Sequence, residues 1–205
     1  MGNIYYIGGS PCSGKSTLAG RLADRYGMAY YCLDDHLDEF MDLGARKGDG
    51  YLKNAYKMQG DTLWMRDTDE MAEESLEIHR RIYKFCLRDL KRLSQAGDVI
   101  AEGCGFLPEL LKKDQIAADR AIFLVSNGNF QRQRYETFNF PKYVLALCEN
   151  PDAAFDNWMA RDAKVAFAVK KTAEENGYKV LIIDNSSSED RMQLSAEEVF
   201  GLKAK

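Results

Sequence analysis

The sequence predicts an α/β fold in which the strands of a parallel sheet alternate with helices. Two observations support this prediction. Five short apolar runs are separated by stretches of helical periodicity, and a glycine-rich loop follows the first run and precedes the first helix. The chain has 205 residues, of which 45% are hydrophobic and 29% charged, so one domain with a substantial core is expected.

The first strand and the first helix flank this glycine-rich loop. Asn3 to Ile7 is a short β-rich run, and Thr17 to Tyr26 carries Leu18 and Leu22 at helical spacing. The loop reads G-x-x-x-x-G-K-S from Gly9 onward. Glycines let the backbone turn so that successive N–H groups point inward, and the following helix presents its positive end there. The order strand, loop, helix favours a phosphate-binding loop over an ordinary glycine and serine turn.

The whole loop is expected to bind the phosphates of a nucleotide. The residues concerned are Gly9, Ser10, Pro11, Cys12, Ser13, Gly14, Lys15, Ser16 and Thr17. Lys15 is expected to reach the β- and γ-phosphates. Ser16 is expected to offer its hydroxyl to Mg²⁺, a cation that takes few protein oxygens and keeps several waters.

The second predicted strand, Met28 to Leu33, ends at two adjacent carboxylates, Asp34 and Asp35. In an open parallel sheet, ligands bind at the carboxyl ends of the strands. Both carboxylates are therefore expected on the same rim as the phosphate-binding loop, where they are candidates for binding a substrate. The alternative for Asp35 is that its side chain caps the next helix.

A long insertion, Leu37 to Gly97, separates the second strand from the third, and glycines divide it into pieces. We expect it to be largely helical, with one amphipathic helix from Asp69 to Leu93, where apolar residues recur near every 3.6 positions. The part before this helix contains aromatic and cationic residues, among them Arg66. They are candidates for the wall of a substrate pocket, with simple packing as the alternative.

The third predicted strand, Asp98 to Glu102, also ends in a carboxylate. A carboxylate in this position can accept a hydrogen bond from a metal-bound water or from a substrate hydroxyl. Glu102 is therefore a candidate for holding Mg²⁺ and for binding a substrate. An ion pair with a lysine or arginine is the alternative.

Two further strands, Ala121 to Val125 and Lys179 to Asp184, complete the predicted sheet. The segment Asn127 to Asp162 is rich in arginines, including Arg132 and Arg134, and is broken by prolines, so it is a candidate for a lid over bound phosphates. An arginine there would neutralise charge on a transferring phosphoryl group. For each single arginine, a solvated surface position is the alternative.

Charge and hydropathy exclude several classes of function. The net charge of −4 provides no basic surface for nucleic acid, so any affinity for phosphate must be local. No apolar run approaches the ~18 residues that a membrane span requires, and the polar, glycine-rich start does not resemble a signal peptide. We therefore expect a cytoplasmic protein with no membrane partner. The oligomeric state stays open.

The arrangement resembles the nucleoside monophosphate kinase and shikimate kinase-like group of P-loop kinases. The resemblance covers the whole chain in the order of its elements and is specific at Gly9 to Thr17. It implies a three-layer α/β/α P-loop NTPase fold with the sheet order 2-3-1-4-5, and the use of ATP with Mg²⁺. It also implies that the insertion, residues 37–97, holds the phosphoryl acceptor and that residues 127–162 supply lid arginines.

Three sequence features refine this resemblance. The run Glu102 to Pro108 is similar to a stretched D-G-(F/Y)-P-R motif of adenylate kinases, but Glu109 stands in place of the arginine that grips an acceptor phosphate. Asp34 is instead similar to the aspartate with which shikimate, gluconate and antibiotic-modifying kinases engage an acceptor hydroxyl. The run Trp158 to Asp162 is similar to lid segments in which one arginine faces the nucleotide, which favours Arg161 over the other lid arginines.

The expected function is transfer of the γ-phosphoryl group of Mg·ATP to a hydroxyl of a small molecule. The expected catalytic residues are Lys15, Asp34 and Arg161. The candidates for holding Mg²⁺ are Ser16 and Glu102. The candidates for binding the acceptor are Asp34, Asp35, Glu102 and Arg66. A nucleoside monophosphate kinase and a partner-regulated ATPase with the same phosphate-binding loop are the alternatives.

Overall fold

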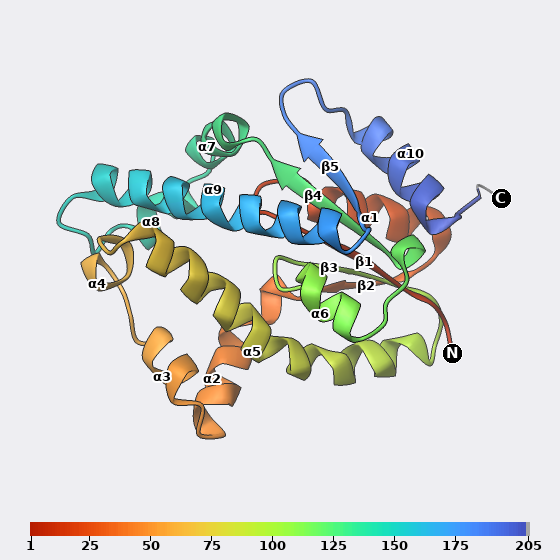
Figure 1. Ribbon diagram of the computed structural model, residues 1–205, viewed down its shortest axis with the longest axis horizontal. Coiled ribbons are helices and arrows are strands. Elements are labelled where there is room, and N and C mark those ends of the chain that lie inside the picture. The colour runs from red at the N-terminus through yellow and green to blue at the C-terminus, as the bar shows by residue number, and fades with distance from the viewer. Residues whose placement is uncertain (204–205) are drawn as a thin grey trace.

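A five-stranded parallel sheet forms the centre of the computed structural model, which describes residues 1–203. In chain order its strands are β1 (Ile4–Gly9), β2 (Ala29–Cys32), β3 (Val99–Glu102), β4 (Ala121–Ser126) and β5 (Lys179–Ile183). They lie side by side in the order β2-β3-β1-β4-β5, which confirms the order implied by the resemblance. Helices cover both faces of the sheet, so the three-layer α/β/α arrangement is confirmed as well (Figure 1).

The strand register brings three loops together at one edge of the sheet. β1 lies between β3 and β4 and pairs in parallel with both. Ile7 of β1 and Cys32 of β2 are both aligned with Glu102, the last residue of β3. β2 and β3 therefore end at the same level, β1 extends two residues further to Gly9, and the loops after the three strands border one rim.

The helices follow the strands in the alternation that the sequence predicts. Those in residues 1–203 are α1 (Lys15–Tyr26), α2 (Leu37–Arg46), α3 (Gly50–Ala55), α4 (Asp61–Trp64), α5 (Thr68–Ser94), α6 (Pro108–Lys113), α7 (Gly128–Glu136), α8 (Phe140–Val144), α9 (Pro151–Glu175) and α10 (Glu189–Phe200), with the 3₁₀ turns η1 (Asp34–His36) and η2 (Ala118–Arg120). α1 and α10 pack together on one face of the sheet, and α5, α6 and α9 cover the other.

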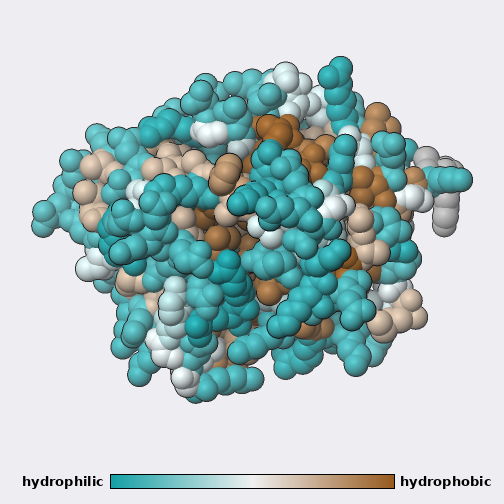
Figure 2. Space-filling model, in the orientation of Figure 1, coloured by the Kyte–Doolittle hydropathy of each residue, from teal (hydrophilic) through white to brown (hydrophobic). Residues whose placement is uncertain are grey.

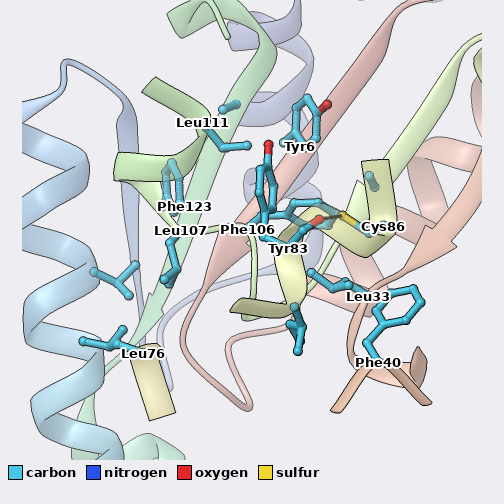
Figure 3. Close-up of a cluster of buried hydrophobic side chains, with 14 of the residues drawn as sticks. Tyr6, Leu33, Phe40, Leu76, Tyr83, Cys86, Phe106, Leu107, Leu111 and Phe123 are labelled. Carbon is cyan, nitrogen blue, oxygen red and sulfur yellow. Dashed lines mark hydrogen bonds between the residues drawn. The ribbon is translucent and has the colours of Figure 1, made fainter. Parts of the chain in front are cut away.

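Alternating side chains of the strands fill two separate cores. Tyr6 of β1 packs into the core beneath α5, α6 and α9, whereas Tyr5 and Ile7 pack into the core beneath α1 and α10. In the first core, the ring of Phe106 packs edge-on against Tyr6 and Tyr83 (Figure 3). This packing anchors the loop that follows β3 and so fixes part of the rim.

The insertion between β2 and β3 is helical, as expected, and comprises α2, α3, α4 and α5. α5 begins after Asp67, whose side chain accepts hydrogen bonds from the backbone N–H groups of Asp69 and Glu70. It extends one residue beyond the predicted helix at each end, from Thr68 to Ser94. Because α5 packs along α9, the insertion lies against the segment predicted to form a lid.

The lid-like segment, residues 127–162, contains α7, α8 and the first half of α9. Asn127 and Asn150 cap α7 and α9 through their side-chain oxygens. α9 continues without a break past Asp162 to Glu175, and it packs against β4 and β5. The end of the predicted segment therefore lies inside one long helix that also covers the sheet (Figure 1).

The face of the molecule drawn in Figure 2 is largely hydrophilic, with hydrophobic residues in scattered groups. Exposed apolar side chains gather on and around α8, where Phe140, Tyr143 and Leu147 are all accessible. Within residues 1–203, no helix combines the length and the apolar character needed to cross a membrane.

Candidate active site

The predicted phosphate-binding loop lies between β1 and α1 and is tied to β4 at its start. Gly9 has a φ of 133°, and a Cβ at this position would lie 1.8 Å from the carbonyl oxygen of Leu124, so only glycine fits. The backbone N–H of Ser10 donates to the same carbonyl at 3.0 Å. The hydroxyl of Ser10 lies 2.8 Å from the hydroxyl of Ser126. The loop therefore has a fixed origin on the sheet.

The first turn of α1 is open toward this loop. Gly14 precedes the helix in the left-handed region, with a φ of 84°, no side chain caps the helix, and its first turn contains no acidic residue. Cys12 also has a positive φ, 54°. The backbone N–H groups at the start of α1 thus keep their hydrogen-bonding capacity and the positive end of the helix dipole, which together suit a phosphate.

The remaining loop residues support its shape or border an adjacent pocket. The hydroxyl of Ser13 donates to the carbonyl of Ser10 at 2.8 Å, and the carbonyl of Pro11 accepts from the hydroxyl of Ser126 at 3.1 Å. Thr17 lines a pocket of about 230 Å³ that opens beside the loop. The sequence of the loop is therefore used for internal hydrogen bonds as well as for its expected ligand.

Lys15 is buried despite its charge, with 5% of its surface exposed. Its ammonium donates to the carbonyl of Ser10 at 2.8 Å and to the sulfur of Cys104 at 3.4 Å. Burial lowers the pKa of this ammonium, but Cys104, Asp34 and Glu102 raise it, so that the pKa lies above its ordinary value. Lys15 is therefore a cation that links the phosphate-binding loop to the loop after β3.

Glu102 at the end of β3 is held by two hydroxyl groups. Ser16 and Tyr30 each donate a hydrogen bond to its Oε1, both at 2.8 Å. Its other oxygen, Oε2, is buried and has no hydrogen-bond partner in the part of the chain that the structure describes. An orphaned carboxylate oxygen next to a serine hydroxyl fits a divalent cation.

This pair suits Mg²⁺ better than a cation that requires a protein cage. Among residues 1–203, no three His, Cys, Asp or Glu side chains gather into a metal-binding group. Mg²⁺ commonly takes one or two protein oxygens and completes its shell with water and phosphate oxygens. The hydroxyl of Ser16 and the carboxylate of Glu102 match that requirement.

Asp34 lies on the same rim, at the first position of η1. Its two carboxylate oxygens accept hydrogen bonds from the backbone N–H of Cys104 at 2.8 and 3.1 Å. A Cβ on Gly103 would lie 2.9 Å from Oδ1 of Asp34, so the glycine makes room for the carboxylate. Asp35 is exposed, and within the described residues its side chain forms no hydrogen bond or ion pair and does not cap α2.

A pocket of about 260 Å³ lies between the helices of the insertion and α9. Arg66 and Arg161 line it together with Asp38 and Glu74. Arg66 forms an ion pair with Glu74 and also donates to the carbonyl of Leu63 at 3.3 Å. Arg66 thus lies in the wall of a pocket, with its charge balanced by Glu74, and its contact with a substrate stays a prediction.

Arg161 belongs to the wall of the same pocket. Its guanidinium stacks on the rings of Trp64 and Trp158, 5.0 and 6.0 Å from their centroids, and forms an ion pair with Asp162 at 2.6 Å. The two tryptophan rings stack on each other with centroids 4.6 Å apart. Because Trp64 comes from α4 and Trp158 from α9, Arg161 lies at the junction of the insertion and the lid-like segment.

The other two lid arginines occupy different places. Arg134 lines the pocket beside the phosphate-binding loop, together with Cys12 and Gly14. Arg132 forms an ion pair with the exposed Asp156. The sequence pattern placed Arg161 first, whereas Arg134 is the lid arginine that shares a pocket with the loop.

His79 of α5 was not singled out from the sequence, yet it lines the pocket that contains Arg66 and Arg161. Only 9% of its surface is exposed. It lies three positions before Ile82 and seven before Cys86, both fully buried, and is thus a polar residue on the apolar face of the helix. That helical spacing is the signal that could have identified it.

Comparison with known proteins gives a likeness in fold. No family model matches the chain, and no curated protein matches its sequence. A solved structure of shikimate kinase from Bacteroides thetaiotaomicron is similar, with a TM-score of 0.54 and 11% identity over 98% of this chain and 99% of that one. A structure from Thermus thermophilus has a TM-score of 0.50 and 14% identity over 98% of each chain. Both likenesses agree with the five-stranded sheet described above.

Proposed function

We propose that this protein is an ATP-dependent kinase that transfers the γ-phosphoryl group of Mg·ATP to a hydroxyl of a small molecule. The observation that carries the proposal is the meeting of Lys15, the Ser16–Glu102 pair and Asp34 on one rim of the sheet. The likeness in fold to a shikimate kinase supports it. The pocket between the insertion and α9 lies near this rim at His79.

In this proposal the loop and its neighbours hold the nucleotide. The open backbone N–H groups at the start of α1 bind phosphate oxygens, and the Lys15 ammonium neutralises the β- and γ-phosphates. Arg134 and Phe130 line the pocket beside the loop, where they border the rest of the nucleotide. When Mg²⁺ is bound, it neutralises charge on the phosphate oxygens, and Ser16 and Glu102 hold it directly or through water.

Asp34 takes the role of orienting the acceptor hydroxyl and accepting its proton. The backbone N–H of Cys104 fixes its carboxylate, which leaves lone pairs available on both oxygens. Phosphoryl transfer has a loose transition state, so most of the acceleration is expected from positioning and from charge neutralisation by Lys15, because Arg161 already pairs with Asp162. General-base assistance contributes only ~10²–10⁴-fold.

A nucleoside monophosphate kinase is the second candidate because Arg66 and Arg161 line one pocket and could bind an acceptor phosphate. Two observations disfavour it. Each of these arginines already pairs with a carboxylate, Glu74 and Asp162 respectively. Glu109, which stands in place of the expected phosphate-gripping arginine, forms an ion pair at 3.2 Å with Arg80 of the insertion.

The test is ADP release from Mg·ATP in the presence of pooled acceptors. The pools are nucleoside monophosphates, sugars with sugar acids, and hydroxylated antibiotics. We expect stimulation by an alcohol pool and its loss in Asp34→Asn. Asp35→Asn is the matched comparison, since this neighbouring carboxylate is exposed and its side chain forms no hydrogen bond or ion pair within the described residues. Stimulation by monophosphates alone would favour the second candidate, and no stimulation by any pool would refute a small-molecule kinase.

A further inference from the structure

His79 is a polar side chain whose position in the acceptor pocket has no structural partner to explain it. Neither ring nitrogen forms a hydrogen bond with any residue that the structure describes, and Nδ1 is completely buried. A buried polar group without a partner costs ~1–3 kcal/mol of stability. Nε2, the other ring nitrogen, also lacks a partner but is not completely buried, so it is the atom that a ligand in the pocket can bind.

The loop after β3 places His79 next to Asp34. A Cβ on Gly105 would lie 3.1 Å from Nδ1 of His79, and a Cβ on Gly103 would lie 2.9 Å from Oδ1 of Asp34. Two glycines of one turn therefore leave room for the imidazole and for the carboxylate. His79 is therefore the pocket residue that lies on the side of this turn and of Asp34.

The surroundings of His79 favour the neutral form of its imidazole. Burial lowers its pKa, Arg161 and Lys15 lower it further, and only Asp34 acts in the opposite direction. A neutral imidazole has one donor and one acceptor nitrogen. A hydroxyl group also donates and accepts, so it is the natural partner of such a ring.

The charges that line this pocket cancel. Among the residues that line the pocket, Arg66 and Arg161 are balanced by Asp38 and Glu74. Each arginine already has a carboxylate partner, Arg66 with Glu74 and Arg161 with Asp162. An anionic acceptor would have to break one of these ion pairs or approach the carboxylates of Asp38 and Glu74. Both alternatives cost free energy that an uncharged acceptor avoids.

We propose that the acceptor is an uncharged polyol or sugar, and that His79 is a positioning residue that binds a hydroxyl next to the one engaged by Asp34. The proposal rests on the kinase function proposed above. The pocket volume of about 260 Å³ suits a molecule of this size. His79 orients the acceptor and takes no part in the transfer of the phosphoryl group.

The kinetic test compares acceptors that differ in charge. D-glucose and D-galactose are paired with gluconate and galactonate, and sorbitol and xylitol are added as alditols. In the wild type, we expect turnover with uncharged members of the panel and at least tenfold lower kcat/KM with their acids. His79→Leu should lower kcat/KM for the acceptor by about 10- to 100-fold, mainly through KM, because a bound hydroxyl loses its partner.

Two further variants separate positioning from structure. His79→Gln keeps a donor and an acceptor and should recover much of the loss, whereas His36→Gln removes the other histidine of the chain and should match the wild type. KM for ATP should stay unchanged in all three variants. His79→Leu should be at least as stable as the wild type, because leucine leaves no polar group unpaired. If His79 had a purely structural role, His79→Leu would be less stable than the wild type.

A binding measurement tests the contact directly. The chain has 2 histidines, so ¹⁵N-labelled imidazole spectra contain two sets of signals, and His79→Gln assigns them. With Mg²⁺ and a non-hydrolysable ATP analogue present, addition of the best acceptor from the panel should shift the signals of His79 and leave those of His36 in place.

The outcomes separate this proposal from the proposed function. Turnover with the acids alone, equal acceptor KM values in His79→Leu and the wild type, or unmoved His79 signals at saturating acceptor would overturn the assignment of His79 and leave the kinase function standing. Failure of every acceptor, including nucleoside monophosphates and hydroxylated antibiotics, would instead refute the kinase function on which it rests.

Discussion

Separate replacement of Lys15 and Asp34 tests the division of roles at the rim. Lys15 is a buried cation with 5% of its surface exposed, so a charged group on the protein surface cannot take its place. In the proposed mechanism, its loss removes a positive charge from the site of the transferring phosphoryl group. By comparison with other cationic groups that act on this transition state, Lys15→Ala should lower turnover by ~10³–10⁵-fold.

Asp34→Asn should cost less. The asparagine oxygen can still accept the hydrogen bond that the backbone N–H of Cys104 donates at 2.8 Å, so the loop geometry is retained. The change removes a general base, whose contribution is ~10²–10⁴-fold, and a loose transition state places the effect at the lower end of that range. We expect a loss of about 10²-fold in kcat.

The assay is coupled ADP release at saturating Mg·ATP and acceptor, with folding checked by circular dichroism and thermal melts. Lys171→Ala serves as the control for removal of a lysine, since its side chain is 63% exposed on α9. The assigned roles would be refuted if Asp34→Asn were the slower enzyme while both variants remained folded. Equal losses in Lys171→Ala and Lys15→Ala would also refute them.

Four further predictions concern the rim and its surroundings. Glu102→Gln should raise the Mg²⁺ concentration for half-maximal activity by ~10–100-fold, measured by titration of the metal. Gly103→Ala should lower the free energy of unfolding in urea by ~1–3 kcal/mol, because its φ is 151° and the new Cβ would press on Asp34. Trp64→Ala should cost ~3–5 kcal/mol in calorimetry, since it opens the stack at α9. The pKa of His79 is lowered in the folded chain, so below pH ~6.5 the unfolded chain binds a proton that the folded chain does not. The free energy of unfolding should therefore fall as the pH falls. His79→Gln should weaken this dependence, measured by urea titrations between pH 5 and 7.5.

The sequence was sufficient wherever local chemistry determines the structure. The loop from Gly9 to Thr17 has its spacing because a backbone turn requires it, and the φ of 133° at Gly9 shows this requirement directly. Strand ends were also predictable. Carboxylates that follow parallel strands meet at one edge, and Asp34 and Glu102 both lie close enough to Lys15 to raise its pKa.

The pocket was not predictable in the same way because its walls come from distant segments. His79 borders Asp34 only because α5 packs where Gly105 leaves space for the imidazole. Arg161 stacks on Trp64, which belongs to a short helix of the insertion. Contacts of this kind depend on how helices pack, and no fixed spacing in the sequence encodes them.

The hydrogen bonds of the rim and the pocket are completed to different degrees, and the difference bears on function. The arginines of the pocket, Arg66 and Arg161, already have their carboxylate partners, Glu74 and Asp162. Oε2 of Glu102 and Nδ1 of His79 are buried and have no partner in the described chain. Unsatisfied buried groups weaken the fold, and a ligand that supplied the missing contacts would recover that free energy.

These two orphaned atoms differ in the kind of ligand that they suit. A carboxylate oxygen beside the hydroxyl of Ser16 suits a cation or its water, whereas a neutral imidazole in a pocket of balanced charge suits a hydroxyl. Asp34 is linked to both, since it acts on the pKa of Lys15 and on that of His79. A molecule that brings one hydroxyl to Asp34 and a second to His79 would therefore satisfy the pocket without disturbing either arginine pair, which is why an uncharged polyhydroxylated acceptor accounts for the site better than an anion.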